Sequence, residues 1–257
     1  ATVSLGSLLV PYPQYGNIMQ TNTNGRGRRT HTVDVRAQRR FFKGSTFLID
    51  YAWVHDRQQE WFDDRGQYEV LQSGGKSGWE WRPLLDEPVH RLTSAATVQL
   101  PFGRGHAIGS NMPRALDLAV GGWQYTGTAR YYSGRPLLFG TSYVVTGNPK
   151  LSNPSRSQWF DTSKFSVQDS FTPRSNAWYY DGLDGPGTFM TDMTLTKMFS
   201  LGSTYRLEAR IEAYNALNNI VWDNPDLNLA SANFGKVTRK RVAWTGREVQ
   251  FGLRFVF

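Results

Sequence analysis

Apolar and polar residues alternate with a period of two through most of this chain, and that feature constrains its fold more than any other. The clearest stretch is "YRLEARIEAY" at residues 205–214, where Leu207, Ala209 and Ile211 alternate with charged side chains. Successive side chains of a β-strand point to opposite faces, so the pattern predicts strands with one apolar and one polar face. Helical periodicity is nearly absent, and its best candidate is the short segment "MPRALDLAVGG" at residues 112–122. The sequence therefore predicts an all-β fold.

Seven segments show the alternation, and the connections between them are alternately short and long. The predicted strands cover residues 31–41, 45–55, 91–102, 122–132, 189–199, 205–215 and 247–257. Three shorter connections, at residues 42–45, 103–115 and 200–203, fall on one side of the predicted sheet. The long ones, Arg57–Pro88, Gly134–Pro186 and Asn218–Val242, fall on the other side, which we expect to be the cell exterior. Antiparallel strands of about ten residues, connected in this way, are typical of a transmembrane β-barrel.

A soluble β-sandwich would show the same alternation, because it buries its apolar face and exposes its polar one. Two features favour the barrel. Aromatic residues lie toward the ends of the predicted strands, as in the two interfacial girdles of membrane barrels; they are Phe41, Phe42, Trp53, Phe102, Trp123, Tyr131, Phe199, Tyr205 and Phe257. The apolar face also carries small residues such as Gly127 and Ala213, which lipid accommodates and which would pack poorly in a sandwich core.

The composition and the motifs exclude several classes of function. The chain has no cysteine, so it has neither disulfides nor thiolate metal sites. Its four histidines, at positions 31, 55, 90 and 106, are not at the spacing of metal ligands. The segment "DNPDLN" at residues 223–228 has calcium-like oxygen spacing but lacks the glycine and distal glutamate of an EF-hand, so we expect a turn. With no catalytic or nucleotide-binding motif, we expect neither an enzyme nor a cofactor.

The net charge of +8 is compatible with nucleic acid, anionic lipid or an acidic ligand as a partner. Nucleic-acid binding would require basic residues gathered on one element with interleaved aromatics. The two basic clusters are instead far apart, both on the long-loop side, and comprise Arg26, Arg28 and Arg29, and Arg239, Lys240 and Arg241. We therefore expect no nucleic acid. A cationic rim there would suit the phosphates of lipopolysaccharide, and the alternative is solvated loop charge.

Nine stretches, taken in order, extend this interpretation. They are "LLVPYPQYGNI", "RRFFKGSTFLIDYAWVHD", "VQLPFGRG", "GGWQYTGTARYYSGRPL", "WFDTSKF", "LDGPGTFMTDMTLTKMFSL", "LEARIEAYNALNNIVWDNPD", "FGKV" and the final "REVQFGLRFVF". In order and spacing they resemble the C-terminal part of the TonB-dependent outer-membrane receptors, specifically the Oar-like branch, which carries a carboxypeptidase-regulatory-like domain at its N-terminus. The resemblance covers nearly all 257 residues.

The resemblance implies about the last seven strands of a barrel of roughly 22 strands in the bacterial outer membrane. Residues 1–30 would form an extracellular loop segment, and residues 31–257 the C-terminal part of the barrel. The implied function is energised passage of a large substrate, such as a peptide, a protein or a glycan. The implied partners are outer-membrane lipid and lipopolysaccharide, the plug and earlier strands of the same receptor, and the inner-membrane TonB complex acting through that missing part.

Three groups of residues follow as candidates for roles in such a receptor. The barrel-assembly machinery would read the last strand through Val249, Phe251, Leu253, Phe255 and Phe257. The lumen-facing candidates are Asp192, Thr194, Thr196, Arg206, Glu208, Arg210, Glu212, Gln250 and Arg254. The extracellular aromatic candidates, which either pack the loops into an ordered cap or form a substrate vestibule, are Trp61, Trp79, Trp81, Trp159, Trp178, Tyr179 and Tyr180. The alternative function is that of a secreted, tryptophan-rich β protein that binds glycans or assembles into surface structures.

Overall fold

The computed structural model of the chain describes residues 2–8, 14–15, 27–42, 44–62, 78–84, 87–140, 143–170, 176–177, 179–201, 204–241 and 246–257. Its main sheet is antiparallel and follows the order β1-β2-β4-β5-β8-β9-β10, with β3 paired to β2 off this path. The strands of the path coincide with the seven predicted from the alternation. The all-β prediction is therefore confirmed.

The strands of the main sheet are Arg28–Phe42 (β1), Ser45–Phe62 (β2), Gly78–Pro83 (β3), His90–Gln99 (β4), Trp123–Tyr132 (β5), Thr188–Leu201 (β8), Tyr205–Tyr214 (β9) and Glu248–Val256 (β10). A second, two-stranded sheet pairs Tyr143–Val145 (β6) with Phe165–Val167 (β7). The helices are Leu5–Leu8 (α1), Arg114–Val120 (α2) and the 3₁₀ turn Thr162–Lys164 (η1). None of the described helices is long and apolar enough to cross a membrane.

Continuous register carries the alternation of each strand across the whole sheet. Leu195 pairs with Tyr125 on one side and with Ile211 on the other, and Ile211 in turn pairs with Phe251. Residues directly opposite each other in a sheet share a face, so these side chains belong to one apolar face. Large side chains of this face are exposed, and they include Val33, Val35, Phe47, Ile49, Leu92, Tyr131, Phe189, Tyr205, Val249, Phe251, Leu253 and Phe255.

The buried apolar cluster of the described chain lies outside this sheet. It comprises Leu137, Phe139, Phe160, Phe165 and Leu183, all between the end of β5 and the start of β8. Further apolar side chains pack against it, namely Tyr143, Val145, Trp159, Tyr180, Leu227, Leu229 and Phe234. A soluble sandwich would instead bury the apolar face of its sheet against a second layer. A sheet with an exposed apolar face, and with its apolar core in the loops, is expected where that face meets hydrocarbon. The sandwich alternative is therefore wrong.

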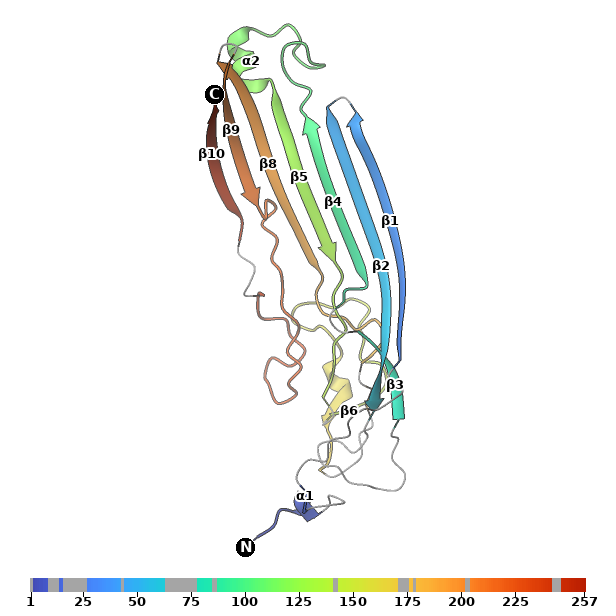
Figure 1. Cartoon of the computed structure of the whole chain (residues 1–257). Helices are drawn as coiled ribbons and strands as arrows, with labels where there is room; N and C mark the ends of the chain where they lie inside the picture. Colours follow the sequence, from blue (N-terminus) through green and yellow to red (C-terminus); the bar gives the residue numbers. More distant parts are fainter. Residues whose placement is uncertain are drawn as a thin grey trace.

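The two ends of the sheet differ in what they carry (Figure 1). The end with the β1–β2, β4–β5 and β8–β9 connections, here called the turn end, also holds α2 and the last residue. The opposite end, the loop end, carries β3, β6 and the long connections. The first long connection was predicted to begin at Arg57, but it begins after Phe62. The reason is that β2 continues past the first residue of β4 and pairs there with β3. The first strand likewise begins at Arg28, three residues before the predicted start.

The described parts of residues 133–187 and 215–241 form one layer at the loop end, which we call the cap. Its base is a close crossing of two backbone segments. The amide of Gly185 donates to the carbonyl oxygen of Arg135 at 2.8 Å, and the amide of Leu137 donates to that of Leu183 at 3.1 Å. A Cβ on Gly134 would lie 1.7 Å from the carbonyl oxygen of Gly185, so the crossing requires glycine at this position.

Lys197 interrupts the apolar face of β8. The residue is only 4% exposed, and its Nζ donates to the carbonyl oxygens of Gly121 at 2.5 Å and of Asp117 at 3.3 Å. These carbonyls belong to the C-terminal end of α2, where a cation is favourable. The rings of Trp123 and Phe199 lie 5.6 Å and 5.1 Å from the same nitrogen. The C-terminal end of the helix thus receives the charged group that β8 places on the apolar face.

Replacing Leu253 by arginine should impair folding far more than replacing Gln250 by arginine. Leu253 lies on the exposed apolar face, whereas Gln250 lies on the polar face and donates to Glu212 at 2.5 Å. A lipid-facing arginine near the bilayer midplane costs ~2–4 kcal/mol. Urea unfolding in lipid vesicles, followed by heat-modifiable migration of the intact protein on gels, measures both variants. Equal effects of the two substitutions would contradict the assignment of the faces.

Replacing Gly134 by alanine should loosen the cap without affecting the sheet. The added methyl group has no room beside Gly185, and overpacking of this kind typically costs about 1–3 kcal/mol. Hydrogen exchange of the Leu137 and Gly185 amides should therefore accelerate. Gly140→Ala is the matched control, because its Cβ would come no closer than 3.9 Å to any neighbour, the ring of Tyr143. Unchanged exchange in the Gly134 variant would show that the crossing does not hold the cap.

Candidate functional site

The polar face of the last three strands carries the lumen-facing candidates, and the register sets them in rows. Thr194 pairs with Glu212, which pairs with Gln250; Thr196 pairs with Arg210; Glu208 pairs with Arg254; Arg206 pairs with Ser200; and Asp192 pairs with Thr128. All nine candidates lie on the face opposite the exposed apolar side chains. The sheet therefore brings together on one surface residues that come from three separate strands.

Opposite charges on this polar face lie next to each other. Arg210 lies 3.2 Å from Glu208 and 3.3 Å from Glu212 along its own strand. Arg130 of β5 lies 2.7 Å from Asp192 of β8, whose other carboxylate oxygen accepts from the amide of Asn215. These groups are partly exposed, and exposed ion pairs contribute little to stability. Their importance is that they make the face hydrophilic and electrically balanced, as a surface in contact with water requires.

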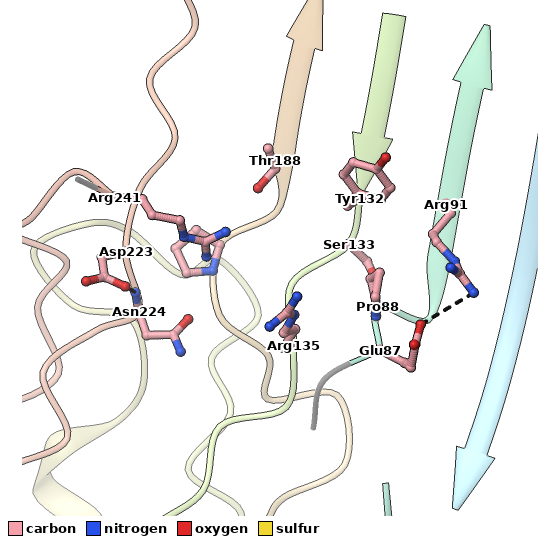
Figure 2. A pocket seen from close by; sticks show the side chains of 11 residues that line it. Glu87, Pro88, Arg91, Tyr132, Ser133, Arg135, Thr188, Asp223, Asn224 and Arg241 are labelled. Carbon is pink, nitrogen blue, oxygen red and sulfur yellow. Dashed lines mark hydrogen bonds and ion pairs between the residues drawn. The ribbon is translucent and has the colours of Figure 1, made fainter. Parts of the chain in front are cut away.

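A pocket of about 700 Å³ opens where this polar face meets the cap (Figure 2). Its floor is one row of the sheet, because Arg91 of β4 pairs with Tyr132 of β5, which pairs with Thr188 of β8. Loop residues complete the lining, namely Glu87, Pro88, Ser133, Arg135, Pro186, Asp223, Asn224 and Arg241. Its volume is within the range of small-molecule binding sites. The pocket belongs to the polar side of the sheet because its floor does.

Arginine dominates the charge of the pocket. Arg91 is paired, 3.4 Å from Glu87, with both side chains about two-fifths exposed. Within the described part of the chain, the guanidinium groups of Arg135 and Arg241 have no ion-pair or hydrogen-bond partner. Figure 2 shows these two side chains between the end of β5 and the Asp223–Asn224 segment. Two unpaired guanidinium groups that come from different loops are suited to bind a carboxylate or a phosphate, each offering two parallel donors.

A half-buried carboxyl group, that of Asp184, lies next to this pocket, two residues before Pro186. Burial raises the pKa of Asp184, and the nearby charge of Asp181 acts in the same direction, while Lys150 and His90 partly oppose the shift. The backbone of Asp184 is also engaged, because its carbonyl oxygen accepts from Nε1 of Trp159 at 2.7 Å. The charged form of Asp184 is therefore disfavoured at the base of the cap.

The described aromatic candidates occupy two places, and none of them lines the pocket. Trp159 and Tyr180 pack against the buried cluster of the cap. Trp81 lies under the guanidinium of Arg29, 4.5 Å away, and Tyr179 accepts a hydrogen bond from Arg57. The side chains of Trp61 and Trp79, and the whole of Trp178, lie outside the described residues. Trp159 and Tyr180 thus belong to the packing of the cap, whereas Trp81 and Tyr179 contact arginines of β1 and β2.

No group of three histidine, aspartate or glutamate side chains in the described ranges could hold a metal ion. The segment at residues 223–228 forms turns, in which the carboxylates of Asp223 and Asp226 accept from the backbone amides of Asn224 and Asn228. Serine and backbone donors also hold the pKa of Asp226 below its usual range. The turn expected from "DNPDLN" is thus present.

The sequence contained only a partial signal for the pocket. Arg241 belongs to one of the two basic clusters, but Arg91 and Arg135 are isolated arginines in their segments. Residues 91, 135 and 241 meet only because β4 and β5 are neighbours and because the third long connection folds over the second. Neither periodicity nor motif spacing records that proximity.

Comparison with known proteins gives one match. A family model described as an outer membrane beta barrel domain matches residues 1–250. No curated protein and no solved structure shows significant similarity to the chain. The matched range includes every residue of the pocket and of the described cap.

Replacing Asp184 by asparagine should remove a pH dependence of the cap. Because the folded state raises the pKa of Asp184, its contribution to stability is fully present below the unfolded pKa of about 4 and is lost as the pH rises through the folded value. Near pH ~4, protection of the Leu137 amide against hydrogen exchange should therefore be equal in the unchanged protein and in the Asp184→Asn variant. At higher pH the Asp184→Asn variant should be the better protected. Equal protection at every pH would contradict the burial of a charged carboxylate.

Proposed function

The chain belongs to the outer membrane β-barrel domain family, and we propose that it forms part of the wall and the extracellular cap of a TonB-dependent receptor of the Oar-like branch. Membership of the family places the chain in the bacterial outer membrane and gives it a barrel-wall role. The proposal goes further in assigning energised transport of a large substrate, with no catalytic role. It rests on the resemblance of the motifs and on the pocket.

The single observation that carries the proposal is the pocket with two unpaired arginines, Arg135 and Arg241, at the loop end of the polar face. Its floor row, which contains Arg91, continues along β4 as the polar face that would line the lumen. A substrate captured there would be at the entrance of the transport path. Because the two free groups are cationic, we propose that the first contact is with an acidic group of the substrate, either on a peptide or on a glycan.

The edges of the sheet support the idea that further strands complete the barrel. Among the described strands, β1 and β10 each pair on one side only, with β2 and with β9. The free-energy cost of an unpaired strand edge in hydrocarbon is prohibitive, because each unsatisfied backbone group costs several kcal/mol there. We propose that other strands of the same receptor pair with both edges. In this proposal, the plug lies against the polar face and the inner-membrane TonB complex supplies the force that moves it.

The loop end of the apolar face offers contacts to lipopolysaccharide. Arg29 and Arg57 are opposite each other on β1 and β2, on the same face as the exposed apolar residues. Arg29 stacks on Trp81 and Arg57 donates to Tyr179, so both guanidinium groups are held at this rim, the loop end of the apolar face. Cations at this level would meet the phosphates of the outer leaflet. This rim faces lipid, whereas the pocket lies on the opposite side of the sheet.

Replacing Arg135 or Arg241 by glutamine should weaken binding of an acidic ligand by the intact receptor. The probes are an oligoglutamate peptide and an oligogalacturonate, each compared with an uncharged counterpart by calorimetry in detergent. Loss of a hydrogen bond to a charged group costs about 1.5–3 kcal/mol, which corresponds to a roughly tenfold to hundredfold rise in Kd. Lys236→Gln is the matched control, because it removes the same charge from the same connection outside the pocket.

Three results would contradict the proposal. If neither acidic probe binds better than its uncharged counterpart, or if the control variant weakens binding as much as the pocket variants, the pocket is not the capture site. Uptake of the bound probe, carrying a fluorophore, is then measured in intact cells with and without a protonophore. Uptake that continues unchanged after the proton gradient has collapsed would contradict energised transport.

A further inference from the structure

The helix α2 exposes an almost entirely apolar surface. In this segment of seven residues, Asp117 is the one residue that is half-buried, and its carboxylate accepts from the amide of Arg104. Apart from Arg114 at its start, the exposed residues of the helix are alanine, leucine and valine. Leu116 is 51% exposed, Leu118 63% and Val120 40%. A surface helix in water normally presents polar residues on its outer side, so this helix has the composition of one in an apolar environment.

Two residues of the lipid-facing side of the sheet hold this helix. Lys197 donates to the carbonyl oxygens of Gly121 and Asp117, as described above. Trp123, the first residue of β5, donates from Nε1 to the carbonyl oxygen of Ala119 at 2.9 Å. Lys197 and Trp123 are directly paired and share a face with the exposed apolar side chains. The C-terminal end of α2 is therefore attached to the face of the sheet that meets hydrocarbon.

The point of attachment lies inside the apolar band and not at its edge. The row that contains Trp123 and Lys197 continues into Ala209 and Leu253. On the same face, the next row toward the turn end contains Phe199, Leu207 and Phe255. The last row contains Leu201 and Tyr205. Each row occupies about 6–7 Å of strand length, so more than one apolar row separates the end of the helix from the tip of the sheet.

We propose that α2 is a membrane-embedded helix that lies in the phospholipid leaflet at the turn end, with Leu116, Leu118 and Val120 in contact with acyl chains. The occupant of this surface follows from continuity, because the helix is attached within the lipid-facing surface of the barrel wall. Arg114, the first residue of the helix, and Arg104 beside it are exposed and are suited to the phosphate headgroups. A soluble partner protein would have to displace lipid from the surrounding rows to reach the same side chains.

Site-specific fluorescence on the intact protein in liposomes tests this placement, and the chain contains no native cysteine that would interfere. An environment-sensitive fluorophore is attached to Leu118→Cys. The two references are Phe251→Cys on the lipid-facing sheet, where Phe251 is 78% exposed, and Ser157→Cys in the cap. Each labelled protein is quenched separately by iodide in the buffer and by lipids that carry a nitroxide on the acyl chain.

The label at position 118 should behave like the label at position 251. Its emission should shift to the blue, iodide quenching should be lost, and nitroxide lipids should quench it strongly. Quenching by iodide as efficient as at position 157, with no effect of the nitroxide lipids, would place α2 in water and overturn the proposal. Protection from both quenchers would mean that protein covers the helix, and would overturn it equally.

Discussion

The rest of this structure depends on one requirement, which is that every backbone N–H and C=O group inside a membrane must have a partner within the protein. The ladders that join β1 to β10 satisfy it between neighbouring strands. Once the backbone is paired in this way, alternate side chains must face hydrocarbon. The apolar residues that form the interior of a soluble protein are then on the outside, and the apolar packing moves to the cap, where Phe160 and Leu137 are almost completely buried.

The sequence predicted the parts of the fold that follow from local periodicity. The seven strands of the main path and their two faces were predicted, because each depends on neighbours within a few residues, and residues 112–122 were named as the best helical candidate. The extension of β2 to Phe62 was missed for a physical reason. Beyond the membrane both faces of a strand are wet, so "DRQQE" at residues 56–60 shows no alternation of apolar and polar residues.

The features that the sequence did not predict depend on partners far away along the chain. Lys197 interrupts an apolar face, and its acceptor at Gly121 lies 76 residues earlier. The pocket assembles Arg91, Arg135 and Arg241 from one strand and two loops. The lumen-facing residues were proposed by alternation alone, and the register sets them on one face, but it does not by itself assign them a role in transport. Pairing rules act at short range, whereas sites in loops are produced by the packing of whole segments.

The position of the cap core separates the residues that shape the loops from the residues that build the wall. Leu137, Phe139 and Phe165 keep the loops in shape without contributing to the strands that cross the bilayer. Residues on the surface of the cap can therefore change without altering the side chains of the strands that cross the bilayer. The crossing at Gly134 and Gly185 lies where residues 133–187 leave and rejoin the sheet, so it marks the boundary at which this segment of the cap, without residues 215–241, could be exchanged between related barrels.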